Sequence, residues 1–270
     1  MPTLNSRGFT NVVSNLSTIG FVFADDPAFT DTMQRLSSNA FERLACGPGD
    51  YAIWRSRTGV EVWFHVTGNR DGDGHLKDNE IIGLTPFFEG LSDVAVEVTE
   101  AHTRPGDNEF EGSFHAWVDP DADTGTGVHP IVFDAVDFAA HCNREMPFLA
   151  RAKLAGFARE VRVLTDDDAN AAARADSTAR SFMAIGLFAG KGQTGGAATQ
   201  PSSNALLTGQ VMEHSKLVNE ETGAAFHWLL IRCADQTYDI LADPAVIVSG
   251  DPAVGSFVEV ATVFFGRIVG

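Results

Sequence analysis

Apolar and polar residues alternate along most of the chain after Tyr51, and this alternation restricts the fold more than any other feature. Successive side chains of a strand point to opposite faces of a sheet, so period-two runs predict strands with one buried face. In Val94–Thr99, three valines alternate with Ala, Glu and Thr. Runs of this kind lie at Tyr51–Trp54, Val60–Val66, Ile81–Phe88, Val94–Ala101, Phe110–Val118, Val128–Asp134, Leu206–Val218, Phe226–Cys233, Thr237–Ala242 and Val258–Val269. We therefore expect a chain rich in β-sheet.

The first fifty residues carry a different pattern. Asp25 followed by Asp26 and Pro27 is typical of a helix start, because Asp accepts from free backbone N–H groups and Pro suits the first turn. Apolar residues then recur every three or four positions up to Gly47, at Phe29, Met33, Leu36, Ala40 and Leu44. This spacing predicts one amphipathic helix that runs to Gly47.

The chain as a whole is predicted to be an α+β protein with four parts. These are an N-terminal helical region (1–50), a β-rich module (51–189) with a short helix near 168–180, a linker-like stretch (190–203) and a small β-barrel-like module (204–270). The linker is rich in Gly, Ser and Thr, which favour flexible connections. We expect the antiparallel β-rich modules to be two small barrels of the Greek-key or OB-like type.

Two parts of this pattern leave alternatives open. Phe148–Leu164 fits a strand with a bulge at Gly156 or an Ala-rich helix, and its Val-rich end favours the strand. Phe114–Trp117 is echoed by Phe226–Trp228, and each is followed by an aromatic-Asp pair, at Asp134 and Asp239. These echoes indicate either an internal duplication or chance similarity among strands.

Acidic residues outnumber basic ones by 36 to 19, which gives a formal charge of −17. The excess is concentrated in Glu61–Asp123, where 15 acidic residues stand against 3 basic ones. Such a field repels nucleic-acid phosphates and anionic lipid heads, and it attracts cations or a basic protein. We therefore expect no membrane or nucleic-acid partner. The acidic loops either keep the chain soluble or attract a cation or basic protein partner.

The three cysteines, Cys46, Cys142 and Cys233, lie far apart and form no Cys-x-x-Cys pair. This argues against a disulfide framework or a thiolate zinc site, and we expect reduced, buried thiols. The first residues lack the layout of a secretion signal, and no apolar run approaches the ~18 residues that span a membrane. These features predict a cytoplasmic protein.

The segment from Asn69 to Glu80 resembles an EF-hand calcium loop. Its ligand positions fall on Asn69, Asp71, Asp73, His75 and Glu80, and its turn position on Gly74. Two features depart from the pattern: Asn stands at the first position, and Lys77 stands where a ligand or its water would be. The flanking runs also predict strands. We therefore expect a weak structural Ca²⁺ site in a β-hairpin, with a plain acidic turn as the alternative.

A second group of candidate residues contains carboxylates and imidazoles. Asp134, Asp137 and His141 would share one face of a helix, with His102 as a further candidate. Such a set could hold a metal or act as an acid–base pair, which would make the protein a metal-dependent hydrolase. The alternative is structural, because Asp137 is also a natural helix N-cap.

The leading functional expectation is a non-catalytic binding or interaction protein. The chain contains no Gly-x-Ser-x-Gly or Ser-x-x-Lys motif for a catalytic nucleophile. It also contains no phosphate loop, and no Gly-x-Gly-x-x-Gly follows a predicted strand. The alternatives are the metal-dependent hydrolase and an OB-type nucleic-acid-binding module, which the net charge disfavours.

Overall fold

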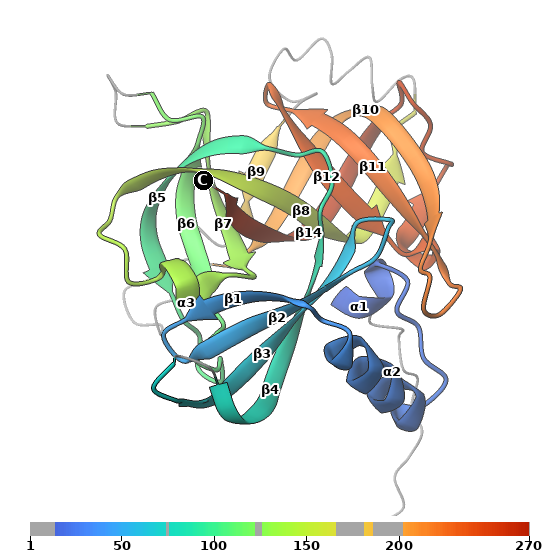
Figure 1. Ribbon diagram of the computed structural model, residues 1–270. Coiled ribbons are helices and arrows are strands. Elements are labelled where there is room, and N and C mark those ends of the chain that lie inside the picture. Colours follow the sequence, from blue (N-terminus) through green and yellow to red (C-terminus); the bar gives the residue numbers. More distant parts are fainter. Residues whose placement is uncertain (1–13, 74–75, 122–125, 166–180, 186–201, 270) are drawn as a thin grey trace, which may run out of the picture.

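The protein is mostly β-sheet, with few and short helices (Figure 1). The computed structural model describes residues 14–73, 76–121, 126–165, 181–185 and 202–269. The helices are α1 (Asn15–Thr18), α2 (Asp26–Ser38), α3 (Phe138–His141) and the 3-10 turn η2 (Pro244–Val246). The strands are β1 (Glu42–Cys46), β2 (Gly49–Arg55), β3 (Val60–Arg70), β4 (Leu76–Phe88), β5 (Val94–His102), β6 (Ser113–Val118), β7 (His129–Ala135), β8 (Phe148–Val163), β9 (Phe182–Ala184), β10 (Asn204–Val218), β11 (Ala225–Cys233), β12 (Gln236–Ala242), β13 (Ile247–Ser249) and β14 (Phe257–Val269). No helix in this part of the chain is both long enough and apolar enough to cross a membrane.

The strands predicted from the period-two runs are confirmed, with small differences at their ends. The helix predicted from Asp25 onward starts there, and the Asp25 carboxylate accepts from the N–H of Ala28 at 2.9 Å. Its predicted end at Gly47 is wrong, because α2 ends at Ser38 and β1 follows. The apolar residue Leu44 fits the helical spacing but lies in an edge strand paired with Tyr51.

Strands β1 to β4 form an antiparallel four-stranded sheet in chain order, called here the N-terminal sheet. Its strand β3 is buried on both faces from Val60 to Val66. One face, with Phe64, packs with α2 residues such as Met33 and Leu36 in a single apolar cluster. The other face carries Trp63, which packs with Tyr51, and is turned toward the sheet formed by strands β5 to β14.

The remaining strands form a ten-stranded sheet whose pairings close into two rings. In the first ring, β5, β6 and β7 pair in sequence, β8 pairs with β5, and β14 lies between β7 and β8. In the second ring, β10, β11 and β12 pair in sequence, β14 pairs with β10, and β8 lies between β12 and β14. The antiparallel pair of β8 and β14 therefore belongs to both rings, and Figure 1 shows it between the two groups of three strands.

Glycines allow the shared strands to pass closely over the rest of each ring. A Cβ at Gly156 of β8 would lie 2.5 Å from Cδ1 of Ile240 in β12. A Cβ at Gly266 of β14 would lie 2.3 Å from Cδ2 of Phe133 in β7. Both positions thus require glycine for packing rather than for a turn.

The strand interpretation of Phe148–Leu164 is confirmed, but the bulge lies elsewhere than predicted. Gly156 is in register with Phe264, whereas Ala261 pairs with Glu160 and Thr262 with Ala158. Arg159 is therefore the extra residue, and the buried face shifts to Val161 after it. The expected helix at 168–180 and residues 190–201 of the expected linker lie outside the described residues.

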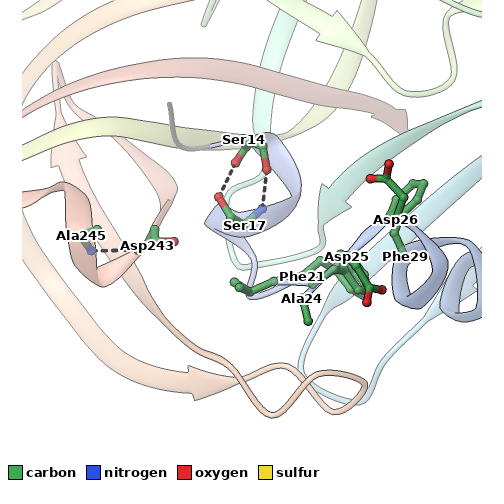
Figure 2. Close-up of a pocket in the computed structure, with 11 residues that line it drawn as sticks. Ser14, Ser17, Phe21, Ala24, Asp25, Asp26, Phe29, Asp243 and Ala245 are labelled. Carbon is green, nitrogen blue, oxygen red and sulfur yellow. Dashed lines mark hydrogen bonds between the residues drawn. The ribbon is translucent and has the colours of Figure 1, made fainter. Parts of the chain in front are cut away.

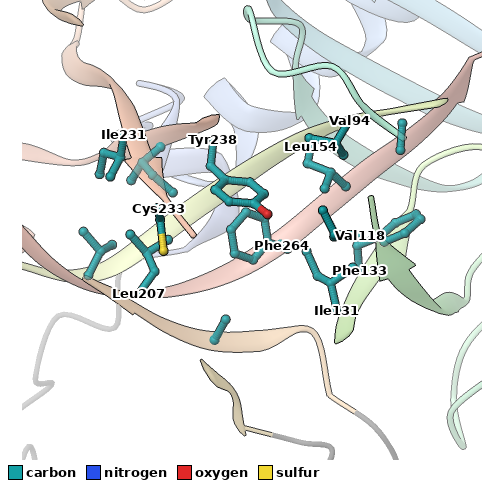
Figure 3. Close-up of a cluster of buried hydrophobic side chains, with 14 of the residues drawn as sticks. Val94, Val118, Ile131, Phe133, Leu154, Leu207, Ile231, Cys233, Tyr238 and Phe264 are labelled. Carbon is teal, nitrogen blue, oxygen red and sulfur yellow. The ribbon is translucent and has the colours of Figure 1, made fainter. Parts of the chain in front are cut away.

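The interiors of the two rings form one continuous apolar cluster. Figure 3 shows Phe133 and Leu154 of the first ring close to Phe264 and Tyr238, with side chains of the second ring beyond them. The hydroxyl of Tyr238 lies 2.8 Å from Nε2 of His129, so a hydrogen bond joins β12 to β7 inside the core. A second cluster fills the space between the rings and the N-terminal sheet.

A buried ionic network also joins the N-terminal sheet to the rings. Glu61 of β3 is fully buried and accepts from Nε1 of Trp63 at 2.6 Å and from Nε of Arg55 at 2.5 Å. Arg267 of β14 lies 3.9 Å from Glu61 and donates to Glu89 at 2.8 Å. Burial raises the pKa of Glu61, and the hydrogen bond from Trp63 and the guanidinium groups of Arg55 and Arg267 oppose that shift.

Candidate functional site

A polar pocket of about 290 Å³ lies where β4, β7 and the loop after β5 meet, and we call it the junction pocket. Its lining residues are Asn15, Leu84, Thr85, Pro86, Arg104, Asp107, Glu111, Gly112, Asp134, Ala135 and Phe265. The loop is positioned by its own turns, since the Asp107 carboxylate accepts from the N–H of Arg104 at 2.7 Å. The pocket therefore gathers charged side chains from segments that are distant in sequence.

Arg104 and Asp134 are the central ion pair of this pocket. The guanidinium of Arg104 donates to Oδ1 of Asp134 at 2.8 Å and lies 3.5 Å from Asp107. Burial raises the pKa of Asp134, and the pairing with Arg104 and a hydrogen bond from Ser203 oppose that shift. Perturbed carboxyl groups in a pocket are typical of functional sites, although ion pairs that stabilise a fold produce the same shift.

A buried histidine lies directly behind the pocket. His65 of β3 is fully buried, with its ring stacked on Phe110 at a centroid distance of 5.3 Å. Its Nδ1 accepts from the Asn108 amide at 3.2 Å, so Nε2 carries the hydrogen and donates to Thr85 at 3.1 Å. Burial lowers the pKa of His65 to about 4. The imidazole is therefore neutral at pH 7.

Gly83 allows this histidine contact to form. It pairs with His65 across the sheet, and a Cβ there would lie 2.8 Å from both Nδ1 of His65 and Nδ2 of Asn108. We expect Gly83→Ala to separate the two polar groups and to lower the free energy of unfolding by about 1–3 kcal/mol. Urea unfolding measures this change.

Gly47→Ala is the matched control, because no atom lies within 4 Å of a Cβ at Gly47. That variant should stay within about 0.5 kcal/mol of the natural chain. An equal, small effect of both substitutions would show that the His65–Asn108 contact tolerates an added methyl group.

Of the residues predicted as a catalytic cluster, Asp137 and His141 contact each other, whereas Asp134 and His102 have other partners. Asp134 lines the junction pocket with Arg104, whereas Asp137 is 1% exposed and accepts from the N–H of Ile268 at 2.9 Å. His141 lies 3.3 Å from Asp137, and His102 lies 3.1 Å from Glu100. Among the described residues, no group of three metal-ligating side chains is assembled.

Asp239 occupies in the second ring the position that Asp134 occupies in the first. Each lies in the third strand of its ring, at the place where that strand has a parallel neighbour. Asp134 lies where β7 pairs with β14, and Asp239 lies where β12 pairs with β8. Asp239 accepts from the N–H of Ser92 at 2.6 Å and from Nε1 of Trp228 at 2.7 Å. It therefore anchors the connection between β4 and β5, while Asp134 faces a pocket.

The predicted calcium loop is described in part. The flanking hairpin prediction is confirmed, since Asn69 pairs with Lys77 across β3 and β4. Asp71 accepts from the N–H of Asp73 at 3.0 Å and lies 3.5 Å from the Lys77 ammonium. Glu80 lies in β4 and is exposed, and the predicted ligand His75 lies outside the described residues. Calcium binding at Asn69–Glu80 stays a prediction, and Lys77 is a competing cation for Asp71.

A larger pocket of about 600 Å³ lies between the N-terminal segment and η2, and we call it the Phe–Asp pocket. Its lining residues are Ser14, Ser17, Phe21, Val22, Phe23, Ala24, Asp25, Asp26, Phe29, Asp243 and Ala245. Figure 2 shows Asp243 on one side and Asp25 and Asp26 on the other, with Phe21 between them. No Lys or Arg is among the described residues that line it.

Local structure fixes both sides of the Phe–Asp pocket. Asp25 caps α2, and Asp243 caps η2 by accepting from the N–H of Ala245 at 2.8 Å. Phe23 stacks on Phe21 at 6.0 Å and meets Phe29 edge to face at 5.4 Å. The pocket thus combines the capping carboxylates of Asp25 and Asp243 with the half-buried rings of Phe23 and Phe29, which pack on the buried Phe21.

Comparisons of this chain with protein-family models, with curated proteins and with solved structures found no match.

Sequence reasoning missed most of the residues that form the junction pocket. Arg104 lies in a Thr-Arg-Pro-Gly-Asp turn, and such a turn is typical of any loop. His65 lies inside an apolar run, which gave no sign of a buried polar contact. The acidic N-cap Asp25 was recognised as a helix signal, but its place beside Asp243 depends on the three-dimensional fold.

Proposed function

We propose that this protein is a non-catalytic binding protein whose partner is a basic segment of another protein, held in the Phe–Asp pocket. The observation that carries the proposal is the lining of that pocket, where Asp25, Asp26 and Asp243 stand beside Phe21, Phe23 and Phe29. Its volume of about 600 Å³ lies in the range of ordinary ligand pockets.

The chemistry of this lining suits a lysine or arginine side chain. Carboxylates accept charge-assisted hydrogen bonds from ammonium and guanidinium groups. Aromatic rings attract the same cations through their π faces and pack against the aliphatic part of the side chain. The formal charge of −17 adds a long-range attraction that speeds the approach of a basic partner.

We propose that the two rings, which carry the pocket, are interlocked barrels of the OB type. In each ring, three strands pair in sequence and a fourth returns beside the first, which is the Greek-key order. A fifth strand then runs parallel to the third and completes the ring. Five-stranded Greek-key barrels of this kind serve as rigid binding scaffolds.

The alternative functions have less support. Oligonucleotide binding to such barrels uses the loop between the first two strands, but here that loop packs on the N-terminal segment or sheet in both rings. In the first ring, Phe110 accepts from Tyr51, and in the second, Asn219 donates to Ile19. Asp137 contacts His141, but Asp134 pairs with Arg104, so the set proposed for the hydrolase is not assembled among the described residues.

A labelled oligolysine peptide tests the proposal by fluorescence anisotropy, with oligoglutamate as the peptide control. We expect binding that weakens as salt is raised toward 1 M, where the Debye length falls to about 3 Å. The triple variant Asp25→Asn, Asp26→Asn, Asp243→Asn removes three charges from the pocket and keeps the caps, because Asn caps as well as Asp. It should weaken binding by about 10- to 100-fold, from roughly 0.5–1 kcal/mol per charge.

A control triple variant separates the pocket from the total charge. Glu109→Gln, Glu213→Gln and Asp235→Asn also remove three negative charges, but at sites outside the pocket. Binding by this variant should change by less than about threefold. Equal weakening by both triple variants, or no binding of oligolysine at low salt, contradicts the proposal.

A further inference from the structure

Two histidines touch each other on the β10–β11 hairpin, away from both pockets. Nε2 of His214 lies 2.9 Å from Nδ1 of His227, and the two ring planes differ by 9°. Neither residue lines the junction pocket or the Phe–Asp pocket. The contact is therefore a separate feature of the second ring.

The antiparallel ladder holds the two histidines in place. His214 pairs with Leu229, and Lys216 pairs with His227, so the histidines are diagonal neighbours on one face of the hairpin. Both side chains are half-buried. Burial, His214 and Lys216 lower the pKa of His227, whereas Asp251 raises it. The ladder thus holds the two imidazoles close together on one face of the hairpin.

Neutral imidazole nitrogens are ligands for borderline divalent metal ions, and two of them at this separation can bind one ion. With metal–nitrogen bonds of about 2.0–2.1 Å, cis ligands at a right angle lie about 2.9 Å apart, close to the observed distance between the two nitrogens. The ring centroids are 5.1 Å apart and the rings are nearly coplanar, so the nitrogens face each other and both rings must tilt before their lone pairs converge on one ion. We propose that His214 and His227 form a chelating site for a divalent transition-metal ion of the Cu²⁺ or Ni²⁺ class, with water in the remaining positions.

Binding requires a change of tautomer in this pair. The contact between the nitrogens contains one hydrogen, which lies on His214 Nε2 or on His227 Nδ1. In the metal-bound form both of these nitrogens are free of hydrogen, and each ring keeps its hydrogen on the other nitrogen. No net proton is released from two neutral rings.

The full chain, titrated with CuCl₂ and NiCl₂ by calorimetry at pH 7.5, tests this site. We expect one equivalent of metal to bind, with Cu²⁺ tighter than Ni²⁺ and Zn²⁺ weaker than Cu²⁺. Ca²⁺ and Mg²⁺ should not compete, because these ions prefer oxygen ligands. His214→Ala and His227→Ala should each weaken binding by at least about tenfold.

His102→Ala is the matched control, since His102 lies in β5 and pairs with Glu100. It should leave metal affinity unchanged. A second measurement on the natural chain does not depend on folding of the variants: paramagnetic Cu²⁺ should broaden NMR signals of β10 and β11 before all others. Tight binding that both histidine variants retain, broadening centred elsewhere, or no binding of Cu²⁺ overturns the proposal.

Discussion

Lowering the pH from 7 to 5 is expected to reduce the free energy of unfolding by about 3–4 kcal/mol. The cause is two buried histidines, His65 and His129, whose pKa values burial lowers to about 4. In the unfolded chain an imidazole titrates near 6.5, so between about pH 6.5 and 4 the unfolded state binds protons that the folded state does not. Stability is therefore complete above about pH 6.5 and is lost as the pH falls.

Variants separate the two histidines from other titrating groups. Burial raises the pKa values of Asp134 and Asp239, which acts in the opposite direction because those groups gain protons in the folded state. Urea unfolding at pH 7 and pH 5 should show that His65→Gln and His129→Gln each reduce the pH-dependent loss by about 2 kcal/mol. Equal pH dependence in the natural chain and in both variants would contradict the assignment.

Arg267→Met is expected to destabilise the protein by about 3–5 kcal/mol. Arg267 is largely buried and lies between Glu61 and Glu89, so its removal leaves the fully buried Glu61 carboxylate with less positive charge nearby. The loss of stability is measured by urea unfolding at pH 7. It should be larger there than at pH 5, because protonation of Glu61 relieves the unpaired charge.

Two further variants show whether the buried charge is the cause. Arg57→Met removes an exposed arginine that pairs with Glu220, and it should change stability by less than about 0.5 kcal/mol. Adding Glu61→Gln to Arg267→Met should cost less than the sum of the two single changes, because the pair acts together. Additive effects would show that Arg267 acts through packing alone.

The strands of this protein were predictable because burial on one face imposes a period of two on the sequence. β5 is the clearest case, with its three valines buried and the residues between them more exposed. β1 was missed because it is an exposed edge strand in which Leu44 also fits a helical period. The bulge lies at Arg159, whereas the sequence predicted it at Gly156. A shift of the apolar residues from one strand face to the other locates a bulge only to within a few residues.

Local sequence patterns do not predict which distant segments contact each other. The pairing of β8 with β14 joins residues about a hundred positions apart, and its register depends on packing inside both rings. The echo of Phe133-Asp134 in Tyr238-Asp239 does fall on equivalent strands. The Phe-His echo also falls on equivalent strands, β6 and β11, but not at equivalent positions. Phe114 pairs with Phe133, whereas Ile231, not Phe226, pairs with Tyr238.

The candidate site shows the same limit. Asp134 was selected for its spacing to Asp137 and His141, but its partner Arg104 comes from a loop thirty residues earlier. The excess of acidic residues can be counted in the sequence. That Asp25 and Asp243 line the same pocket can be seen only in the folded structure.

The sharing of β8 and β14 by both rings has a consequence for synthesis of the chain. The first ring contains strands made early, but it closes with residues 265–269 of β14. At about 5–20 residues per second, a ribosome needs roughly 5–20 s to add the hundred or so residues that separate β8 from the end of β14. During that interval β7 and β8 expose unpaired edges, which invite association with other chains. We therefore expect the nascent chain to be most prone to association before β14 is made.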